Sequence, residues 1–512
     1  MNLRHPILVA IATAALTVSA VALGPSLLTP GAAAPSAKPG LALVGAAKAS
    51  IEPRPDDYGG TWERDRDACA RMDQSVLTEL VDNTEEHVDH LATAGSPWPE
   101  NPNCIYMGGF GIGPANPVTE WDSELGLWVR SVAIGDGTDT LVLTVIDGEG
   151  YFADYANKCD DCGIAQLSEE LGIELGIDPS GIVIASTHAH SAPDFIGGWG
   201  FVPDWYMAQV ADTIRDTVRD AVEAMEPAVL EVGEELARPH NSERRDTYRS
   251  AEEQQLAWLR AYTPGKKGRG RTIATVGAFA AHPTTTGTNN GIAHPDWPGM
   301  FVNSVEDRFG GIGALFMTGL GNMSSSGGTA MGQRLAQLIP QVGSGTRLAD
   351  TDVRTGRRSW LHPTTNVPLT SLGAAGLFDR QFAATPSSVR TGKRPDTAPC
   401  LSASPHSVEV SASAARIGDQ FALTTSPGEI FANFSNTVKE KSTALVTMPL
   451  GQANDALGYM PQQFEINEAG QQGLGFVAGG VAVVNYEDAY SIDRCFGDAA
   501  LEEAISLLDD LR

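Results

Sequence analysis

Two closely spaced histidines have the clearest capacity for chemistry in this chain. His188 and His190 follow an apolar run at 181–185, which predicts a buried strand. Residues two apart on a continuing strand share one face, so both imidazoles would reach one cavity. Neutral imidazoles suit zinc better than calcium or magnesium. A further histidine, His282, ends another apolar run and precedes a proline. Together these histidines predict a metal-dependent hydrolase.

Three other polar residues follow predicted strands, namely Ser324, Glu429 and Tyr459. In open α/β sheets, binding groups gather beyond the carboxyl ends of strands, which favours one shared site. Each residue also has a structural interpretation. Glu429 would stabilise the start of a predicted helix at 430–440 through the helix dipole. Tyr459 would pack as a core aromatic, Ser324 would belong to a flexible loop, and a single histidine after a strand is often a hydrogen-bonded structural residue.

The elements that must position these residues alternate between strands and helices, which predicts an α/β fold with mixed sheets flanked by helices. Strands are predicted at 127–134, 140–146, 181–186, 229–232, 272–281, 314–318 and 444–448, with a hairpin over 408–425. Helices are predicted at 75–92, 164–175, 205–225, 298–308, 331–339, 430–440 and 502–511. The polar stretch at 343–400 predicts a long excursion, and the Gly- and Gln-rich stretch at 462–480 predicts a loop.

The N-terminus has the pattern of an export signal. Arg4 and His5 precede an apolar run at 7–23, and small residues at 32–34 offer a cleavage site. A retained membrane anchor is the alternative, although Thr and Ser interrupt the run. The sequence therefore predicts a secreted protein with three parts: a signal peptide at 1–34, an Ala/Pro/Gly-rich tether at 35–60 and a single large catalytic domain at 61–512.

The cysteine content agrees with export. Six cysteines follow the predicted signal, and an even count in an oxidising compartment favours disulfides. Cys159 and Cys162 have the spacing of a redox or metal pair, but no second CxxC completes a four-sulfur zinc site, so a local disulfide is favoured. The first expectations for the other four cysteines are Cys69–Cys104 and Cys400–Cys495.

The composition limits the classes of partner. The formal net charge of −28 argues against nucleic-acid binding, which depends on Lys and Arg neutralising phosphates. It also argues against electrostatic docking on anionic lipid. A hydrophobic content of 42% is sufficient for a sizeable core. No pattern specifies an oligomeric state or a second structural metal such as Ca²⁺ or Mg²⁺.

Six short motifs follow one another in an order that resembles the neutral (alkaline, non-lysosomal) ceramidase family. They extend over most of the chain, from about Gly108 to Tyr490. The motifs are Thr187-His188-Ala189-His190-Ser191, His282-Pro283-Thr284, His294-Pro295-Asp296-Trp297-Pro298-Gly299, Gly321-Asn322-Met323-Ser324, Pro427-Gly428-Glu429 and Asn454 to Tyr459. None is decisive alone, but their common order is a strong signal.

The resemblance implies a zinc amidase that cleaves the N-acyl bond of ceramide with metal-activated water. It implies one zinc ion per chain, held by His188, His282, Glu429 and Tyr459. It assigns His190 beside the metal-bound water and Tyr486 to stabilisation of the oxyanion, and it places a substrate-contacting arginine near 241–245, for which we choose Arg244. Ser324 takes the place of a serine once proposed as nucleophile, and we favour metal hydroxide over it. The substrate implied is a lipid, which would bring the protein into transient contact with a membrane surface.

The chain also departs from the family pattern. Asn322 and Ser325 replace an Asp and a Pro around the serine, Ala192-Pro193-Asp194 replaces Gly-Pro-Gly, and Ala456 replaces an aromatic residue. No C-terminal immunoglobulin-like domain is expected. These changes leave the implied metal ligands intact but alter the pocket, in which Trp199, Phe201 and Trp205 would line an acyl groove or simply pack. Two alternatives stay open: a zinc hydrolase of the same scaffold acting on another amide or an ester, and a non-catalytic cell-surface binding protein.

Overall fold

The computed structural model describes residues 40–69, 103–110, 116–155, 158–159, 161–199, 202–245, 251–265, 270–288, 290–374, 379–380, 382–393, 398–466 and 486–512. The predicted signal peptide at 1–34, the predicted helix at 75–92 and Phe201 lie outside these residues, as does most of the predicted loop at 462–480. The described residues belong to one unit, Ser36–Arg512.

A nine-stranded mixed sheet forms the centre of this unit. Its strands lie in the order β13, β11, β10, β8, β1, β5, β6 and β7, and the short β15 pairs with β8. Neighbouring strands are antiparallel except for the parallel pairs β6–β7 and β11–β13. The strands are β1 Ala42–Ser50, β5 Trp128–Gly135, β6 Thr140–Ile146, β7 Ile182–Ser186, β8 Glu226–Leu236, β10 Gln255–Tyr262, β11 Thr272–Phe279, β13 Ile312–Met317 and β15 Thr346–Arg347.

This sheet is strongly curled. The edge strand β13 contacts β5, β6 and β7, which lie near the other end of the strand order. In a flat sheet, β7 and β11 would lie about 29 Å apart, because six spacings of about 4.8 Å separate them. Apolar side chains from every strand of the main path face one core on the inside of the curl, among them Val132, Leu259 and Phe316. The curl therefore brings distant strand ends together.

A second, four-stranded sheet closes the inside of the curl. It consists of β16 Val353–Pro363, β19 Ser407–Ile417, β20 Phe421–Thr425 and β22 Val446–Leu450. Ile417, Leu423 and Met448 from this sheet join the same core as the curled sheet. The β19–β20 hairpin and the parallel β20–β22 pair fix the order of these strands. The fold is therefore α/β with mixed sheets, as predicted.

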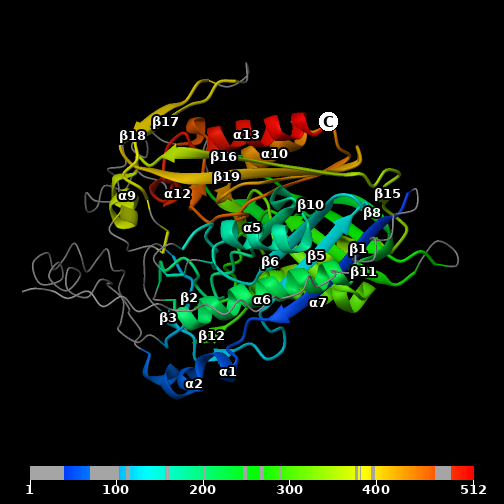
Figure 1. Ribbon diagram of the computed structural model, residues 1–512, viewed down its shortest axis with the longest axis horizontal. Coiled ribbons are helices and arrows are strands. Elements are labelled where there is room, and N and C mark those ends of the chain that lie inside the picture. Colours follow the sequence, from blue (N-terminus) through cyan, green and yellow to red (C-terminus); the bar gives the residue numbers. More distant parts are fainter. Residues whose placement is uncertain are drawn as a thin grey trace, which may run out of the picture. The chain divides into compact units, whose positions relative to one another are not determined.

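Helices cover the outer faces of both sheets (Figure 1). Helix α6 packs on β1 and β5, α7 packs on β13 and on the shorter α8, and α10 and α13 pack on the second sheet. The bounds of these helices are α6 Asp204–Glu223, α7 Asp296–Phe309, α8 Ala330–Leu338, α10 Ala432–Lys441 and α13 Phe496–Asp510. A further helix, α5 Ile164–Leu175, precedes β7 along the chain and packs against it. Most predicted strands and helices are thus confirmed, with shifted ends.

The predicted tether at 35–60 is wrong for residues 42–50. Ala42–Ser50 forms β1, which pairs with β5 on one side and β8 on the other. Its small residues resemble a linker in composition, but they permit close packing with α6. A Cβ atom on Gly45 would lie 2.0 Å from the carbonyl oxygen of Ala221 in that helix. Small side chains here serve helix–strand contact.

The predicted excursion at 343–400 is also wrong in part, because it contains β16. This strand pairs with β19 along its whole length. Three arginines, at 354, 357 and 358, give it a polar sequence, yet each is paired. Arg358 bonds α13, Arg354 bonds the residue just after the end of α13, and Arg357 donates to the carbonyl oxygen of Ile182.

The strand β10 was not predicted, although all but its first residue are buried.

Three disulfides agree with the predicted pairing of the cysteines: Cys69–Cys104, Cys159–Cys162 and Cys400–Cys495. The last of them joins the start of a short strand, β18 Leu401–Ser404, to the residue before α13. Within the described ranges, every helix is too short or too polar to cross a bilayer.

Candidate metal centre

The first two histidines lie just beyond β7. This strand ends at Ser186, and His188 has a left-handed φ of 57°, so the pair lies in a turn. The strand thus ends where it was predicted to end, and the two imidazoles reach one cavity from the turn rather than from one face of a strand. Their ring centroids are 4.9 Å apart, both side chains are buried, and both line the same pocket.

His282 reaches this place from the end of β11. Its main-chain N–H donates to the carbonyl oxygen of Met323, and its Nδ1 lies 2.8 Å from the carbonyl oxygen of Leu320. Ring nitrogens of His188, His190 and His282 lie within 4.8 Å of one another. The three buried histidines therefore form a group able to hold a metal ion, although they come from strands at opposite ends of the curled sheet.

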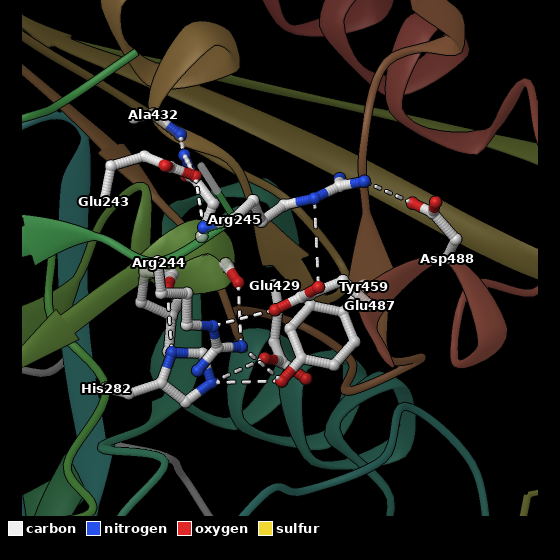
Figure 2. Close-up of polar contacts among 12 residues, drawn as sticks. Glu243, Arg244, Arg245, His282, Glu429, Ala432, Tyr459, Glu487 and Asp488 are labelled. Carbon is white, nitrogen blue, oxygen red and sulfur yellow. Dashed lines mark hydrogen bonds and ion pairs between the residues drawn. The ribbon is translucent and has the colours of Figure 1, made fainter. Parts of the chain in front are cut away.

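Glu429 and Tyr459 join the histidines from two short parallel strands, β21 Glu429–Ile430 and β23 Tyr459–Met460, in which they are direct register partners. The Glu429 Oε2 atom lies 3.0 Å from Nε2 of His282 and 3.5 Å from Nε2 of His188. The Tyr459 hydroxyl lies 3.3 Å from Nε2 of His282. The four side chains predicted as ligands thus converge, three of them visible in Figure 2.

The hydrogen bonding of these rings fits a metal ion. Nδ1 of His188 lies 2.6 Å from the carbonyl oxygen of Glu149, as Nδ1 of His282 faces Leu320. A carbonyl oxygen only accepts, so each Nδ1 carries a proton and each neutral ring presents the Nε2 lone pair. Both lone pairs face one carboxylate oxygen of Glu429, and a cation between them would relieve this opposition of acceptors. Two imidazoles, a carboxylate and a phenol form a donor set that suits zinc.

Burial and neighbouring charges support this protonation state. Burial lowers the pKa of His282 to about 4, and the Arg244 cation adds to this effect. Burial opposes ionisation of Glu429, whereas the imidazoles of His188 and His282, in the state in which they carry a proton at Nε2, hold the pKa of its carboxyl well below the usual range. Burial and the charge of Glu429 raise the pKa of Tyr459, and Arg244 opposes that shift. At neutral pH burial therefore keeps the His282 ring neutral.

Two consecutive arginines point in different directions from β9 Asn241–Glu243 (Figure 2). The Arg244 Nη2 atom donates to the Tyr459 hydroxyl over 2.9 Å, and its Nε donates to Glu487 over 2.8 Å. Arg245 instead donates to Asp488 and to the carbonyl oxygen of Glu465. Arg244 is therefore the member of this pair that reaches the candidate metal centre, while its contact with a substrate stays a prediction.

His190 lines the same pocket as Glu429. Its Nε2 atom is 3.3 Å from Oε1 of Glu149, and the Phe110 ring packs on it with centroids 4.7 Å apart. Burial and the nearby rings of His188 and His282 hold the pKa of His190 well below its usual range. His190 is therefore a buried, neutral imidazole at the pocket wall, and its part in proton transfer stays a prediction.

The other two predicted catalytic residues differ in position. Ser324 lies on β14 Met323–Ser325 and forms a main-chain bridge to His282. It is absent from the described residues that line the pocket. Tyr486 begins α12 Tyr486–Ala489, lines the pocket, is 40% exposed and has its ring centroid 5.9 Å from that of Tyr459. The geometry therefore brings Tyr486, but not the Ser324 side chain, to the pocket.

A largely apolar pocket opens beside the metal centre. Residues of α9 Val367–Ala374 and of the segments that follow β6, β7 and β22 line it. Trp199 lines it, which is one of the two alternatives expected for this residue, whereas Trp205 packs against Tyr206 in the core. Its main apolar lining residues are Phe152, Ile196, Leu369, Phe382, Leu457 and Ile492. These apolar walls lie beside His188 and His190, which line the same pocket.

Sequence reasoning missed two acidic residues of this site. Glu487 holds Arg244, and Glu149 contacts both His188 and His190. Glu149 had a usable signal, because it stands between two glycines just after the predicted strand at 140–146. An acidic residue at a strand end beside a histidine pair on the next strand is a reasonable candidate for the same site.

Comparisons with known proteins give a fold but no family match from sequence. No family model matches the chain, and no curated protein matches it. Neutral ceramidase from Pseudomonas aeruginosa superposes with a TM-score of 0.58 at 14% identity, over 92% of this chain and 75% of that one. A ceramidase complexed with C2 superposes with a TM-score of 0.56 at 14% identity, over 92% of this chain and 74% of that one. The chain has the fold of neutral ceramidase.

Proposed function

We propose that this protein is a zinc-dependent amidohydrolase that cleaves the N-acyl bond of ceramide or a related N-acyl lipid. The observation that carries the proposal is the pair of buried imidazoles, His188 and His282, that present Nε2 to one oxygen of Glu429. An apolar pocket beside this centre supports a lipid substrate. The structural likeness to neutral ceramidase supports an amide as the bond that is cleaved.

The residues around the pocket have distinct roles in this reaction. His188, His282, Glu429 and Tyr459 would hold the zinc ion. When bound, zinc supplies Lewis-acid polarisation of the scissile carbonyl and lowers the pKa of water towards about 7. His190 would take a proton from water and give it to the nitrogen of the leaving amine. The products of adding one water are a fatty acid and an amine.

Donors and apolar walls would position the substrate. The Tyr486 hydroxyl and the Arg244 guanidinium are the groups proposed to face the developing negative charge on the carbonyl oxygen, which preorganised donors stabilise strongly. The apolar lining would bind the acyl chain and exclude bulk water from the reacting amide. A lipid substrate would bring the protein into transient contact with a membrane surface.

We propose an extracellular location as part of this function. Three disulfides are typical of an oxidising compartment. Cleavage of a signal peptide at 1–34 stays a prediction. It is compatible with the fold, because cleavage there leaves β1 intact. The catalytic unit would then begin before β1 at Ala42 rather than at residue 61.

Metal analysis combined with a substrate panel tests the proposal. We expect about one zinc per chain, loss of amide hydrolysis on chelation, and recovery when zinc is returned. His282→Ala should lower zinc affinity by more than about 100-fold, because a direct ligand matters more than its supporting contacts. His406→Ala, outside the pocket, is the matched control and should keep both zinc and turnover. Full activity of His282→Ala at undiminished zinc would defeat the assignment.

The same panel separates the alternatives. Fluorescent N-acyl sphingosine, simple N-acyl amines and fatty esters distinguish a ceramidase from a hydrolase of another amide or an ester. Binding of these compounds without turnover would indicate the cell-surface binding protein. Ser324→Ala should retain most of the turnover, since its side chain lies outside the pocket. Loss of turnover in Ser324→Ala, together with an acyl-enzyme trapped in the parent, would favour a serine nucleophile instead.

A further inference from the structure

Glu149 lies beside both histidines of the turn after β7 because of the parallel pairing of β6 and β7. In that pair, Ile146 is the register partner of Ser186. Two parallel strands leave a sheet side by side, so residue 149 travels alongside residues 188–190. The main-chain N–H of Glu149 donates to the carbonyl oxygen of Pro193, which fixes this segment against the turn.

Two different atoms of Glu149 contact the two histidines. Its main-chain carbonyl oxygen lies 2.6 Å from Nδ1 of His188. Its side-chain Oε1 lies 3.3 Å from Nε2 of His190. The backbone of one residue thus faces a candidate metal ligand, and its side chain faces the imidazole that is proposed to move the proton.

The Glu149 carboxyl has no other partner in the described part of the chain. Its residue is 1% exposed, and neither carboxyl oxygen forms a hydrogen bond there. Both ring nitrogens of His190 are likewise buried without a well-aligned hydrogen bond, and the one backbone group that interacts with the ring is that of Gly109 in the described part of the chain. A buried polar group without a hydrogen-bond partner is rare and needs an explanation. Here the carboxyl and the imidazole explain each other, because they face each other at 3.3 Å and a small rotation would align a hydrogen bond between them.

The surroundings restrict the carboxyl to this position. A Cβ atom on Gly108 would lie only 2.2 Å from Oε2 of Glu149, so a glycine is needed there for the carboxyl to fit. The Phe110 ring, two residues later, covers the face of the His190 ring. One short segment therefore leaves space for the carboxyl and packs against the imidazole that the carboxyl faces.

We propose that Glu149 is the positioning residue of the histidine pair, with its carboxyl holding the ring of His190 and its backbone carbonyl holding the ring of His188. This inference rests on the proposed function, in which the two rings have different tasks. It assigns the side chain to proton transfer alone, because a change of side chain leaves the carbonyl oxygen that faces His188 in place.

The side-chain variants Glu149→Leu and Glu149→Gln test this separation. Glu149→Leu should lower kcat by about 10- to 100-fold, the usual effect of losing a supporting contact, with KM changed by less than about threefold. Zinc affinity, measured by competition with a chelator, should stay within about threefold of the parent. Glu149→Gln retains a carbonyl acceptor and should recover part of kcat. Parallel loss of zinc affinity and kcat would overturn the proposal, as would unchanged kcat in Glu149→Leu.

A second variant reaches the same contact from the other side. Gly108→Ala would push the carboxyl away from His190 without changing Glu149, so its kcat should fall as in Glu149→Leu while zinc is retained. Combining the two substitutions should add little further loss, because both remove one contact. Additive losses would show that the two positions act independently and would overturn the proposal.

A spectroscopic measurement keeps the inference independent of turnover. In protein with ¹⁵N-labelled histidine, the ring nitrogens report which of them carries a proton. We expect Glu149→Leu to change the ring signals of His190, assigned with His190→Gln, and to leave those of His188 unchanged. This result is expected even if no N-acyl lipid is hydrolysed, so failure of the proposed function is distinguishable. Unchanged His190 signals would overturn the positioning role.

Discussion

Single residues set the charge state of the candidate metal centre. Tyr459 is a weak metal ligand while its phenol is protonated, and burial raises the pKa of this phenol. The positive charge of Arg244, which donates a hydrogen bond to the phenol oxygen, opposes this shift in the pKa, and Glu487 holds the guanidinium in place. Arg244 therefore supports the ligand oxygen from outside the donor set, in the manner of supporting contacts at other metal sites.

Substitution of Arg244 should therefore weaken metal binding. Arg244→Gln removes the positive charge beside Tyr459, and we expect zinc affinity to fall about 10- to 100-fold. Equilibrium competition with a chromogenic chelator measures this change. The matched control is Arg245→Gln, because Arg245 bonds Asp488 and Glu465 and shares with Arg244 only a longer ion pair of 3.8 Å to Glu487. Equal loss of zinc affinity in the two variants would contradict the assignment.

At the scale of elements, the close contact between α6 and β1 fixes the part of the curled sheet that carries β5, β6 and β7. The side chains of β1 are small, and Gly45 lies under the last turns of the helix, with Ala221 and Met225 as its nearest neighbours. β1 also joins the two halves of the sheet, because it pairs with β5 and β8. The histidine turn after β7 depends on this half.

Gly45→Val should consequently destabilise the fold. Its Cβ would lie 2.0 Å from the carbonyl oxygen of Ala221, so the helix must move, at a cost of about 3 kcal/mol or more in the free energy of unfolding. Thermal or urea unfolding measures the change. Gly287→Val is the control, since a Cβ at the exposed Gly287 meets nothing within 4 Å. A melting temperature equal to the parent in Gly45→Val would show that the contact is looser than described.

For the whole molecule, stability depends on pH through carboxyls that the fold buries. Burial raises the pKa of Glu465 from 4.5 to about 7, although hydrogen bonds from Gln462 and Asn433 oppose the shift. A folded-state pKa above the unfolded value means that the folded protein holds the proton more tightly. The stability that this group contributes is therefore present below about pH 4.5 and is lost as pH rises towards 7.

Glu465→Gln should remove this dependence. Glutamine resembles the protonated carboxyl, so the variant should match the parent near pH 5 and exceed it at pH 8, by up to about 3 kcal/mol in the free energy of unfolding. Chemical unfolding of metal-free protein at the two pH values measures it. Glu440→Gln, at an exposed position, is the control for loss of charge alone. A constant offset between variant and parent at both pH values would contradict this explanation.

The sequence by itself determined the local features of this protein. Apolar periodicity located most helices and strands, because their burial depends on neighbouring residues in the chain. It failed at β1 and β16, where small or arginine-rich sequences are stabilised by partners far along the chain. The motif order placed His188, His282, Glu429 and Tyr459 together through resemblance, and the even cysteine count favoured disulfides in the pairs that the structure contains.

Only the tertiary structure decided how these residues meet. His188 and His282 follow strands that lie six neighbours apart, and the curl of the sheet brings them to one carboxylate. Glu149 and Glu487 entered the site in the same way, through strand pairing and a distant ion pair. Curl and long-range pairing arise from the packing of whole sheets against helices, a property of the assembled core that no short window of sequence contains.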